Sequence, residues 1–448
     1  MLTAILRTAT SSLYRSVTTT AWAAQAARKS ALRKSPSKLC RRQIMTTATI
    51  HSVSASSTAA DIVQFFSDLA RRWQELREKN EKLRIRNAAE QLGVSEAELL
   101  ATRVGNGVTR LNNDFKKLFT EVEGLGSVMA LTRNDAMVHE KTGQYKDLSI
   151  HGNMGLALGV IDLRIFFNRF VYGFAVQEGA GENMRNSLQF FNAQGEAVHK
   201  IYANSNTDMQ AFRNLVERYR AAEQSAFIVL DNHQPDAAQA EDSQAADNQA
   251  ADNQAKDSNP LLQSPEALNV QQLRKDWSEL KDVHHFQAML KKHQLERIPA
   301  YRAIGADYAQ QLDKQAFEDA LLQAAASELP IMVFVGSEGM VQIHTGPVKT
   351  LLRTGPWFNV LDPDFNLHAN TQLLDQVWLV RKPTTDGVVS ALEMFDAEGR
   401  QVALLFGERK PGKPELEGWR ELLNKLLAKH ALAVKSDADV VQYVAGGE

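Results

Sequence analysis

Residues 187–198 of the chain read SLQFFNAQGEAV, and residues 391–402 read ALEMFDAEGRQV. Leucine, phenylalanine, alanine, glycine and valine recur between the two stretches at a constant offset of 204. In each stretch a short turn sequence, Asn-Ala-Gln-Gly or Asp-Ala-Glu-Gly, separates two apolar runs. Asparagine, aspartate and glycine in such a position are typical of β-hairpins. The chain therefore contains an internal repeat, and each copy is predicted to carry a hairpin.

A second pair of segments supports the repeat. Residues 137–143 resemble residues 340–346 at an offset of 203, because both begin with Met-Val and end with Thr-Gly. Helical segments followed by short strands and a closing amphipathic helix indicate an α+β fold of two tandem repeats, each a meandering antiparallel sheet with flanking helices. The cleft between the duplicated sheets is the expected binding site. Helices are expected at 62–86, 88–100, 207–219, 270–290, 302–325 and 416–430, and strands at 126–131, 162–167, 174–176, 331–335, 357–360 and 377–381.

Two segments lie outside the repeats. Residues 1–60 are basic, rich in hydroxyl side chains and free of acid, as in a mitochondrial transit peptide. Alternatively, the true start is Met45 and residues 1–44 are not part of the protein. Residues 231–264 contain the pentad Ala-Ala-Asp-Asn-Gln twice and almost no large apolar residue, which predicts a flexible acidic linker. The expected domains are therefore residues 61–230 and residues 265–448.

Charge and cysteine content exclude several classes of protein. Residues 1–60 hold nine basic residues and no acid, so the other 42 basic residues face all 53 acidic ones and the rest of the chain has a net charge of −11. An acidic body of this kind does not suggest a nucleic-acid surface. The single cysteine, Cys40, excludes an intramolecular disulfide and a multi-cysteine metal site. No stretch reaches the ~20 apolar residues of a membrane span, and the composition is typical of a protein of a reducing compartment.

Several motifs, taken in order, resemble the HemS-type hemin-degrading factors, tandem-repeat proteins of bacterial haem-uptake systems. The resemblance covers about residues 62 to 430, interrupted by the linker. It rests on order and spacing, since no single short motif is decisive. The matching pieces are residues 88–100 (AAEQLGVSEAELL), Arg133-Asn134, Val138-His139-Glu140, Asp162-Leu163-Arg164, residues 206–209 (NTDM), Asp282-Val283-His284, residues 331–336 (IMVFVG) and residues 381–384 (RKPT).

The resemblance implies that the protein binds one haem b in a cleft between its repeats. By position, His284 matches the axial ligand of the haem iron, and Arg164 matches the catalytic arginine on the opposite, distal face. Met332 matches an apolar residue that lines the pocket. The basic positions near the haem propionates are matched by Arg297, Lys382 and Arg409.

The residues themselves are compatible with these roles but do not require them. A helix over 276–292 would place His284 and His285 about 100° apart, so only one of them faces a given plane, and neutral imidazole is a good ligand for haem iron. Alternation in the strand that contains Arg164 leaves two readings open, a surface salt bridge with Asp162 or a distal cation that donates hydrogen bonds. The repeat equivalent of Arg164, at an offset of 204, is His368.

Other positions depart from the family pattern or have an ordinary interpretation. Phe406 and Glu408 stand where family members often carry Tyr and Gln, and Gln287 stands where they often carry Phe. These changes bear on the peripheral haem contacts more than on the iron ligand. We expect structural roles for His139, His151 and His199, while His344 and His368 lie closer to the cleft; no His and carboxylate spacing indicates a separate metal site.

Two functions remain open at this point. In the first, the protein degrades haem and releases iron, with electrons from an external donor. In the second, it is a haem chaperone that takes haem from an importer and delivers it to a separate haem oxygenase. Both imply a bacterial cytoplasmic protein, and a reductase is a further expected partner of the first. The sequence does not determine the reaction products, the electron donor or the oligomeric state.

Overall fold

A computed structural model describes residues 59–179, 181–231, 268–410 and 412–433. In this part of the chain the strands form two nine-stranded sheets in which every paired neighbour is antiparallel. The predicted α+β fold of two repeats is confirmed. Nearly all residues of the expected N-terminal extension and of the expected linker lie outside the described residues.

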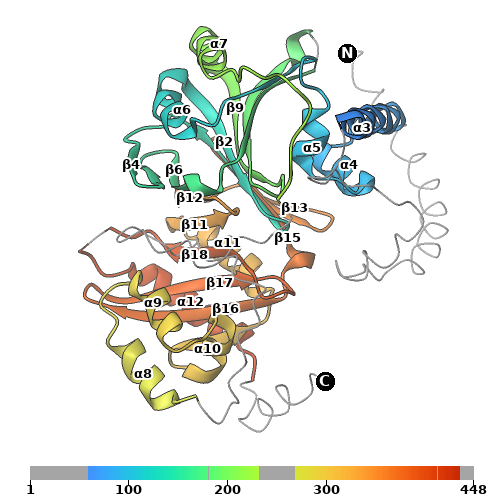
Figure 1. Ribbon diagram of the computed structural model, residues 1–448. Helices are drawn as coiled ribbons and strands as arrows, with labels where there is room; N and C mark the ends of the chain where they lie inside the picture. The colour runs from blue at the N-terminus through green and yellow to red at the C-terminus, as the bar shows by residue number, and fades with distance from the viewer. Residues whose placement is uncertain (1–58, 180, 232–267, 411, 434–448) are drawn as a thin grey trace, which may run out of the picture. The chain divides into compact units, whose positions relative to one another are not determined.

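Each sheet takes six strands from one repeat and three from the other, which the sequence did not predict. Strand β15 of the second repeat pairs with β3 of the first, and β6 of the first repeat pairs with β12 of the second. Figure 1 shows this exchange, with the green β6 next to the orange β12. The first sheet runs β1 (Val108–Arg110), β7 (Tyr172–Glu178), β8 (Arg185–Phe191), β9 (Ala197–Thr207), β2 (Gly126–Arg133), β3 (Met137–Gly143), β15 (Phe365–Asn370), β14 (Trp357–Leu361), β13 (Leu351–Thr354). The second runs β10 (Ala309–Leu312), β16 (Gln376–Thr384), β17 (Gly387–Phe395), β18 (Gln401–Gly407), β11 (Ile331–Gly336), β12 (Met340–Gly346), β6 (Asp162–Phe166), β5 (Met154–Ala157), β4 (Ser149–His151).

The predicted hairpins are present as β8–β9 and β17–β18. In the first, the backbone N–H of Gly195 donates to Asn192 O at 3.0 Å, and Gly399 donates to Asp396 O in the second at the same distance. Both glycines have φ near +75°, a conformation that favours glycine. The local turn chemistry thus determines both hairpins.

Several predicted helices are broken in the structure. The segment 88–100 forms α4 (Ile85–Leu92) and α5 (Glu96–Ala101), because Gly93 takes a left-handed conformation and Ser95 caps the next helix. The segment 270–290 forms α8 (Val270–Ser278) and α9 (His285–Lys292). The segment 302–325 is wrong as a single helix: α10 (Arg297–Ile304) ends at Gly305, β10 follows, and α11 (Ala316–Ala326) begins after it.

The remaining helices are α3 (Ala59–Lys79), α6 (Phe115–Glu121), α7 (Met209–Arg218) and α12 (Glu417–His430). Helices α11 and α12 cover one face of the second sheet, where Val333 and Val335 pack with Leu321 and Leu423 in the largest apolar cluster. On the opposite face, α8 to α10 cover only β10, β16 and part of β17. The rest of that face, toward β6, carries Met332, Phe406 and Arg164, three of the residues that the sequence singled out.

Candidate functional site

One face of the second sheet brings together residues from both repeats. Residues paired across antiparallel strands point to the same face. Met332 pairs with Phe406 on one side, and Val341 pairs with Arg164 of the first repeat on the other. Met332 and Val341 share a face because β11 and β12 pair in register, with Gly336 opposite Val341. Arg164 therefore reaches this face only because β6 crosses to the second sheet.

The centre of this face is apolar. Phe406 and Leu404 cluster with Val283, Val389 and Ala391, and the half-buried Met332 and Phe334 pack against them. Val341 and Ile343 continue the apolar surface toward β6. The rings of Phe334 and Phe406 meet edge to face with their centroids 5.3 Å apart. Phe406 thus contributes its ring to this surface. We call these residues the apolar face.

His284 lies at one edge of the apolar face. It follows Val283, which packs into the face, and it occupies the position before the first residue of α9. The expected continuous helix over 276–292 is therefore wrong, and the backbone N–H of His284 donates to Asp282 Oδ1 at 3.0 Å. Its side chain is 35% exposed, and Nε2 lies 3.4 Å from the same Asp282 oxygen. The imidazole is accessible beside a large apolar surface.

Arg164 lies on the apolar face at its other end. Its side chain is 10% exposed, and its guanidinium forms an ion pair with Asp162, two residues earlier on the same strand. Nη1 also donates to Leu163 O at 3.3 Å. The salt bridge with Asp162 that the sequence suggested is present, but it is buried and not on the surface. A guanidinium fixed in this way keeps its positive charge at all ordinary pH values.

Arg297 and Lys382 surround a buried carboxylate. Lys382 is 2% exposed and Glu393 is 0% exposed, with Nζ donating to Oε1 at 2.9 Å. Arg297 Nη1 lies 3.6 Å from Glu393 Oε2. Burial alone would raise the pKa of Glu393, but the two cations outweigh it and hold the pKa below its ordinary value. The predicted role of both cations at the haem propionates stays a prediction, and their pairing with Glu393 weighs against a direct contact.

The buried carboxylate also links the helices to the sheet. Tyr301 OH and Gln401 Nε2 donate to Glu393 Oε2 at 2.6 and 2.8 Å. Lys382 Nζ lies 4.2 Å from the ring centroid of Phe286, two residues after His284. Sequence reasoning missed Glu393, although an acid inside the apolar run of residues 391–395 is a usable signal, because such an acid needs a buried cation.

Arg409 is the third predicted cation, and its surroundings differ. It follows β18, is half-buried, and its Nε has no hydrogen-bond partner among the described residues. Glu408, which would repel a propionate, lies 3.9 Å from Lys410 Nζ. A buried N–H without a partner costs free energy unless a ligand or water occupies it. Of the three predicted cations, Arg409 is therefore the one with a buried donor that no described residue accepts from, whereas Arg297 and Lys382 are paired with Glu393.

The other histidines lie elsewhere. His139, His199 and His344 are buried, and burial lowers the pKa of His199 to about 3 and that of His344 to about 4. His285 borders a hollow of about 320 Å³ beside α8 and α9, whose lining does not include His284. Within the described ranges, no group of three or more His, Cys, Asp or Glu side chains is arranged to hold a metal ion. The same residues include no helix with the length and apolar character needed to cross a membrane.

Known proteins resemble the chain over most of its length. A family model described as the haemin-degrading HemS.ChuX domain matches residues 93–219 and again residues 294–426. The hemin transport protein HmuS of Yersinia pestis is 36% identical over 350 residues, which cover 78% of this chain and 94% of that protein.

Solved structures give the same result. Holo-PhuS, a heme-binding protein from Pseudomonas aeruginosa, has 42% identity and a TM-score of 0.72, covering 81% of this chain and 99% of PhuS. ChuS, an E. coli heme oxygenase, has 31% identity and a TM-score of 0.68, covering 80% of this chain and 99% of ChuS. The resemblance noted in the sequence is confirmed. With a family domain in each repeat and relatives matched over nearly their whole length, the chain belongs to the HemS family of haemin-degrading proteins.

Proposed function

We propose that the protein binds haem b on the apolar face and acts in haem utilisation, with His284 as the axial ligand and Arg164 on the distal side. One observation carries the proposal. The strand exchange puts a buried arginine of the first repeat on an apolar surface whose edge carries an accessible histidine of the second repeat. The printed names of the relatives, hemin transport protein, heme-binding protein and heme oxygenase, support the same ligand.

The residues present fit a haem. A porphyrin needs a broad apolar surface, and Met332, Phe334 and Phe406 supply one. Iron needs a nitrogen ligand, and the imidazole of His284 lies at the border of that surface. The propionates need a cation with open donors, and Arg409 has a buried Nε without a partner. Lys382 and Arg297 then act indirectly, because they contact Phe286 next to His284.

Two uses of bound haem follow from this arrangement. In the first, the protein degrades haem and releases iron. Haem supplies the redox chemistry when it is bound, and the chain supplies the iron ligand, a fixed distal donor in Arg164 and an apolar surround that excludes water. Electrons then come from a reductase. In the second, the protein carries haem in the bacterial cytoplasm from an importer to a separate haem oxygenase. The name of ChuS, a heme oxygenase, supports the first use, and the name of HmuS, a hemin transport protein, supports the second.

The ligand assignment is tested by an anaerobic haem titration of the full chain and two variants. His284→Ala should weaken haem binding by at least about tenfold, or about 1.4 kcal/mol, and shift the Soret band. His285→Ala is the matched control, because its side chain is adjacent, exposed and outside the apolar face. An unchanged Soret band in His284→Ala, or equal effects of the two variants, would contradict the assignment.

The choice between the two uses is tested by adding oxygen and a reductant, with catalase present to remove free peroxide. Loss of the Soret band with iron release indicates degradation, and a haem that survives indicates a carrier. Arg164→Lys keeps the charge but loses the planar donor group. It should slow degradation with little change in haem affinity if the protein is an enzyme. If the protein is a carrier, the substitution should change only the haem spectrum.

A further inference from the structure

The first sheet contains a counterpart of the apolar face. The registers of the two sheets match strand by strand: Val138 pairs with His368 as Val341 pairs with Arg164. Met129 pairs with Tyr202 as Met332 pairs with Phe406. The predicted equivalence of Arg164 and His368 is therefore confirmed by strand pairing. We call the set of first-sheet positions that corresponds to the apolar face the counterpart face.

The counterpart face is polar where the apolar face is not. Glu140 stands at the position of Ile343, and Lys200 at the position of Leu404. Tyr202 replaces Phe406, and Ser187, which pairs with Tyr202, belongs to β8, the counterpart of β17. A porphyrin placed here would lie against the carboxylate of Glu140 and the hydroxyl groups of Tyr202 and Ser187, and taking such groups out of water costs free energy. This surface suits a small polar ligand.

Histidine and arginine have also exchanged places. His368 occupies the position of Arg164, and Arg84 precedes α4 as His284 precedes α9, both helices being eight residues long. Arg84 is close enough to His368 to lower the pKa of that histidine, after burial as the main cause. His368 Nδ1 lies 2.7 Å from Asn359 Oδ1, and Nε2 lies 4.0 Å from Glu140 Oε2.

Arg133 is a cation of this face with an open hydrogen-bond donor. It stands opposite Val138 in the same row as His368, and its Nε is buried without a hydrogen-bond partner among the described residues. Burial, with Arg86 as the next cause, lowers the pKa of Arg133 to about 10. Its nearest acids are shared: Glu96 is paired with Lys200, and Asp135 is paired with Arg86.

The N-terminus of α4 adds positive potential at the same place. Arg84 is its N-cap residue and makes no side-chain cap hydrogen bond, and the first turn contains no acid. The free N–H groups of such a helix end attract anions. The buried Nε of Arg133 lies on strand β2 and not on this helix, so two separate elements offer donors to an anion here.

We propose that Arg84, Arg133 and His368 form a second ligand site, which binds a small molecule through a carboxylate or phosphate group. An oxyanion placed here would accept hydrogen bonds from Arg133 and Arg84 and supply the negative charge that the shared acids do not. His368, which is near both Arg84 and Glu140, adds a donor when it is protonated. The proposal is independent of haem binding, because none of these residues lies on the apolar face.

The proposal is tested with the full chain by isothermal titration at low ionic strength, using inorganic phosphate and succinate in separate titrations. The probe that binds with the higher affinity shows whether the site prefers a phosphate or a carboxylate. Arg133→Gln and Arg84→Gln should each weaken its binding by at least tenfold, while Arg133→Lys should retain part of it. Arg185→Gln, on the exposed end of β8, is the matched control and should bind as the native chain does. Haem titration should be unchanged in all of these variants.

Three results would overturn the proposal. The first is no saturable binding of either probe at millimolar concentration. The second is an equal loss in Arg185→Gln, which would indicate nonspecific attraction to surface charge. The third is a second equivalent of haem that is lost in His368→Ala, which would make the counterpart face a porphyrin site. Denaturant unfolding of each variant separates loss of the site from loss of the fold, and the Arg84 variant, at an exposed position, keeps the test available if Arg133→Gln unfolds.

Discussion

Glu393 sits on β17 with no exposed surface, and its charge is compatible with that burial only because cations surround it. A buried carboxylate without a partner would take up a proton or destabilise the fold. The first repeat also contains a buried ion pair, but there the acid, Glu96, lies on helix α5 and the base, Lys200, lies on strand β9. An ion pair thus links a helix to the sheet in both repeats, Glu96–Lys200 in the first and Arg297–Glu393 in the second.

Substitution of the acid should cost more than substitution of either cation. Glu393→Leu leaves Lys382 and Arg297 buried with like charge and removes the acceptor of Tyr301, so we expect a loss of about 3–5 kcal/mol in the free energy of unfolding. Lys382→Met should cost clearly less, because Arg297 remains 3.6 Å from the carboxylate. Urea unfolding followed by circular dichroism measures both.

Glu81→Gln, at an exposed position, is the control and should change stability by less than about 0.5 kcal/mol. A Lys382→Met variant as unstable as Glu393→Leu would show that Arg297 does not compensate the acid.

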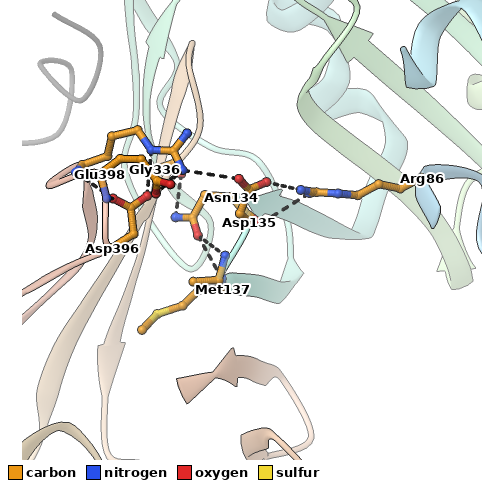
Figure 2. A network of polar contacts seen from close by, with 9 residues as sticks. Arg86, Asn134, Asp135, Met137, Gly336, Asp396 and Glu398 are labelled. Carbon is orange, nitrogen blue, oxygen red and sulfur yellow. Dashed lines mark hydrogen bonds and ion pairs between the residues drawn. The ribbon is translucent and has the colours of Figure 1, made fainter. Parts of the chain in front are cut away.

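At the scale of elements, two turns fasten each repeat to the other. Asn134, in the β2–β3 turn, donates from Nδ2 to Val402 O at 2.8 Å and to Gly336 O at 3.1 Å (Figure 2). Ser337, in the β11–β12 turn, donates in return to Val198 O at 2.7 Å. Asp135 extends the first contact, since it pairs with Arg86 on α4 and lies 3.5 Å from Arg400 Nη2.

The two turns should differ in their contribution to stability. Asn134→Ala removes both donations across the repeats and the acceptor that closes its own turn for Ala136 N and Met137 N, so we expect a loss of about 3 kcal/mol. Ser337→Ala removes one hydrogen bond and should cost about 1 kcal/mol. Urea unfolding measures both losses, and equal values for the two variants would contradict the larger contribution expected of Asn134.

Elements determined by local chemistry could be predicted from the sequence. The β8–β9 and β17–β18 hairpins and helices α7 and α12 agree with their predicted positions, because turn residues and amphipathic spacing are local signals. Strand β10 was missed because its four residues lie between helix-forming stretches. The break before α9 was missed because residues 279–284 contain no glycine or proline to mark it.

The whole molecule depends on pairings that no local signal encodes. Strand β6 could pair with β3 of its own repeat by the same pattern of alternation, yet it pairs with β12 of the other. The candidate site depends on this choice, because Arg164 and His284 come from different repeats. The site residues were therefore predicted through the family resemblance. That resemblance did not point to Glu393 or to the counterpart face.

Buried histidines should make the whole fold sensitive to acid. Burial lowers the pKa of His199 to about 3, that of His344 to about 4 and that of His139 well below its ordinary value. In the unfolded chain these groups titrate near 6.5. Below pH 6.5 the unfolded state binds more protons than the folded state. The free energy of unfolding should therefore decrease as the pH is lowered, by up to about 1.4 kcal/mol per pH unit for each histidine.

Urea unfolding between pH 7.5 and 4.5 measures this dependence in a range above the ordinary carboxylate pKa values. Thr132 Oγ1 donates to Gln342, so it accepts from His199 Nδ1, which therefore carries the proton. His199 Nε2 then accepts from Tyr145 OH at 2.6 Å. His199→Gln should therefore reduce the slope, and the exposed His285→Gln should leave it unchanged. A stability that is flat from pH 6.5 to 4.5 would contradict buried neutral histidines.

The strand exchange predicts that the two repeats hold together without a covalent link. A protease site inserted between residues 232 and 267, followed by cleavage, should give two pieces that elute together in size-exclusion chromatography, because β3–β15 and β6–β12 remain paired. The pieces should separate only in denaturant, which serves as the control. Haem binding adds a second readout, since the nicked complex keeps Arg164 from one piece beside the apolar face of the other. Pieces that separate in native buffer, each with its own sheet signal in circular dichroism, would contradict the exchange. If such a separated second repeat still gave the native haem spectrum, Arg164 would have no part in the site.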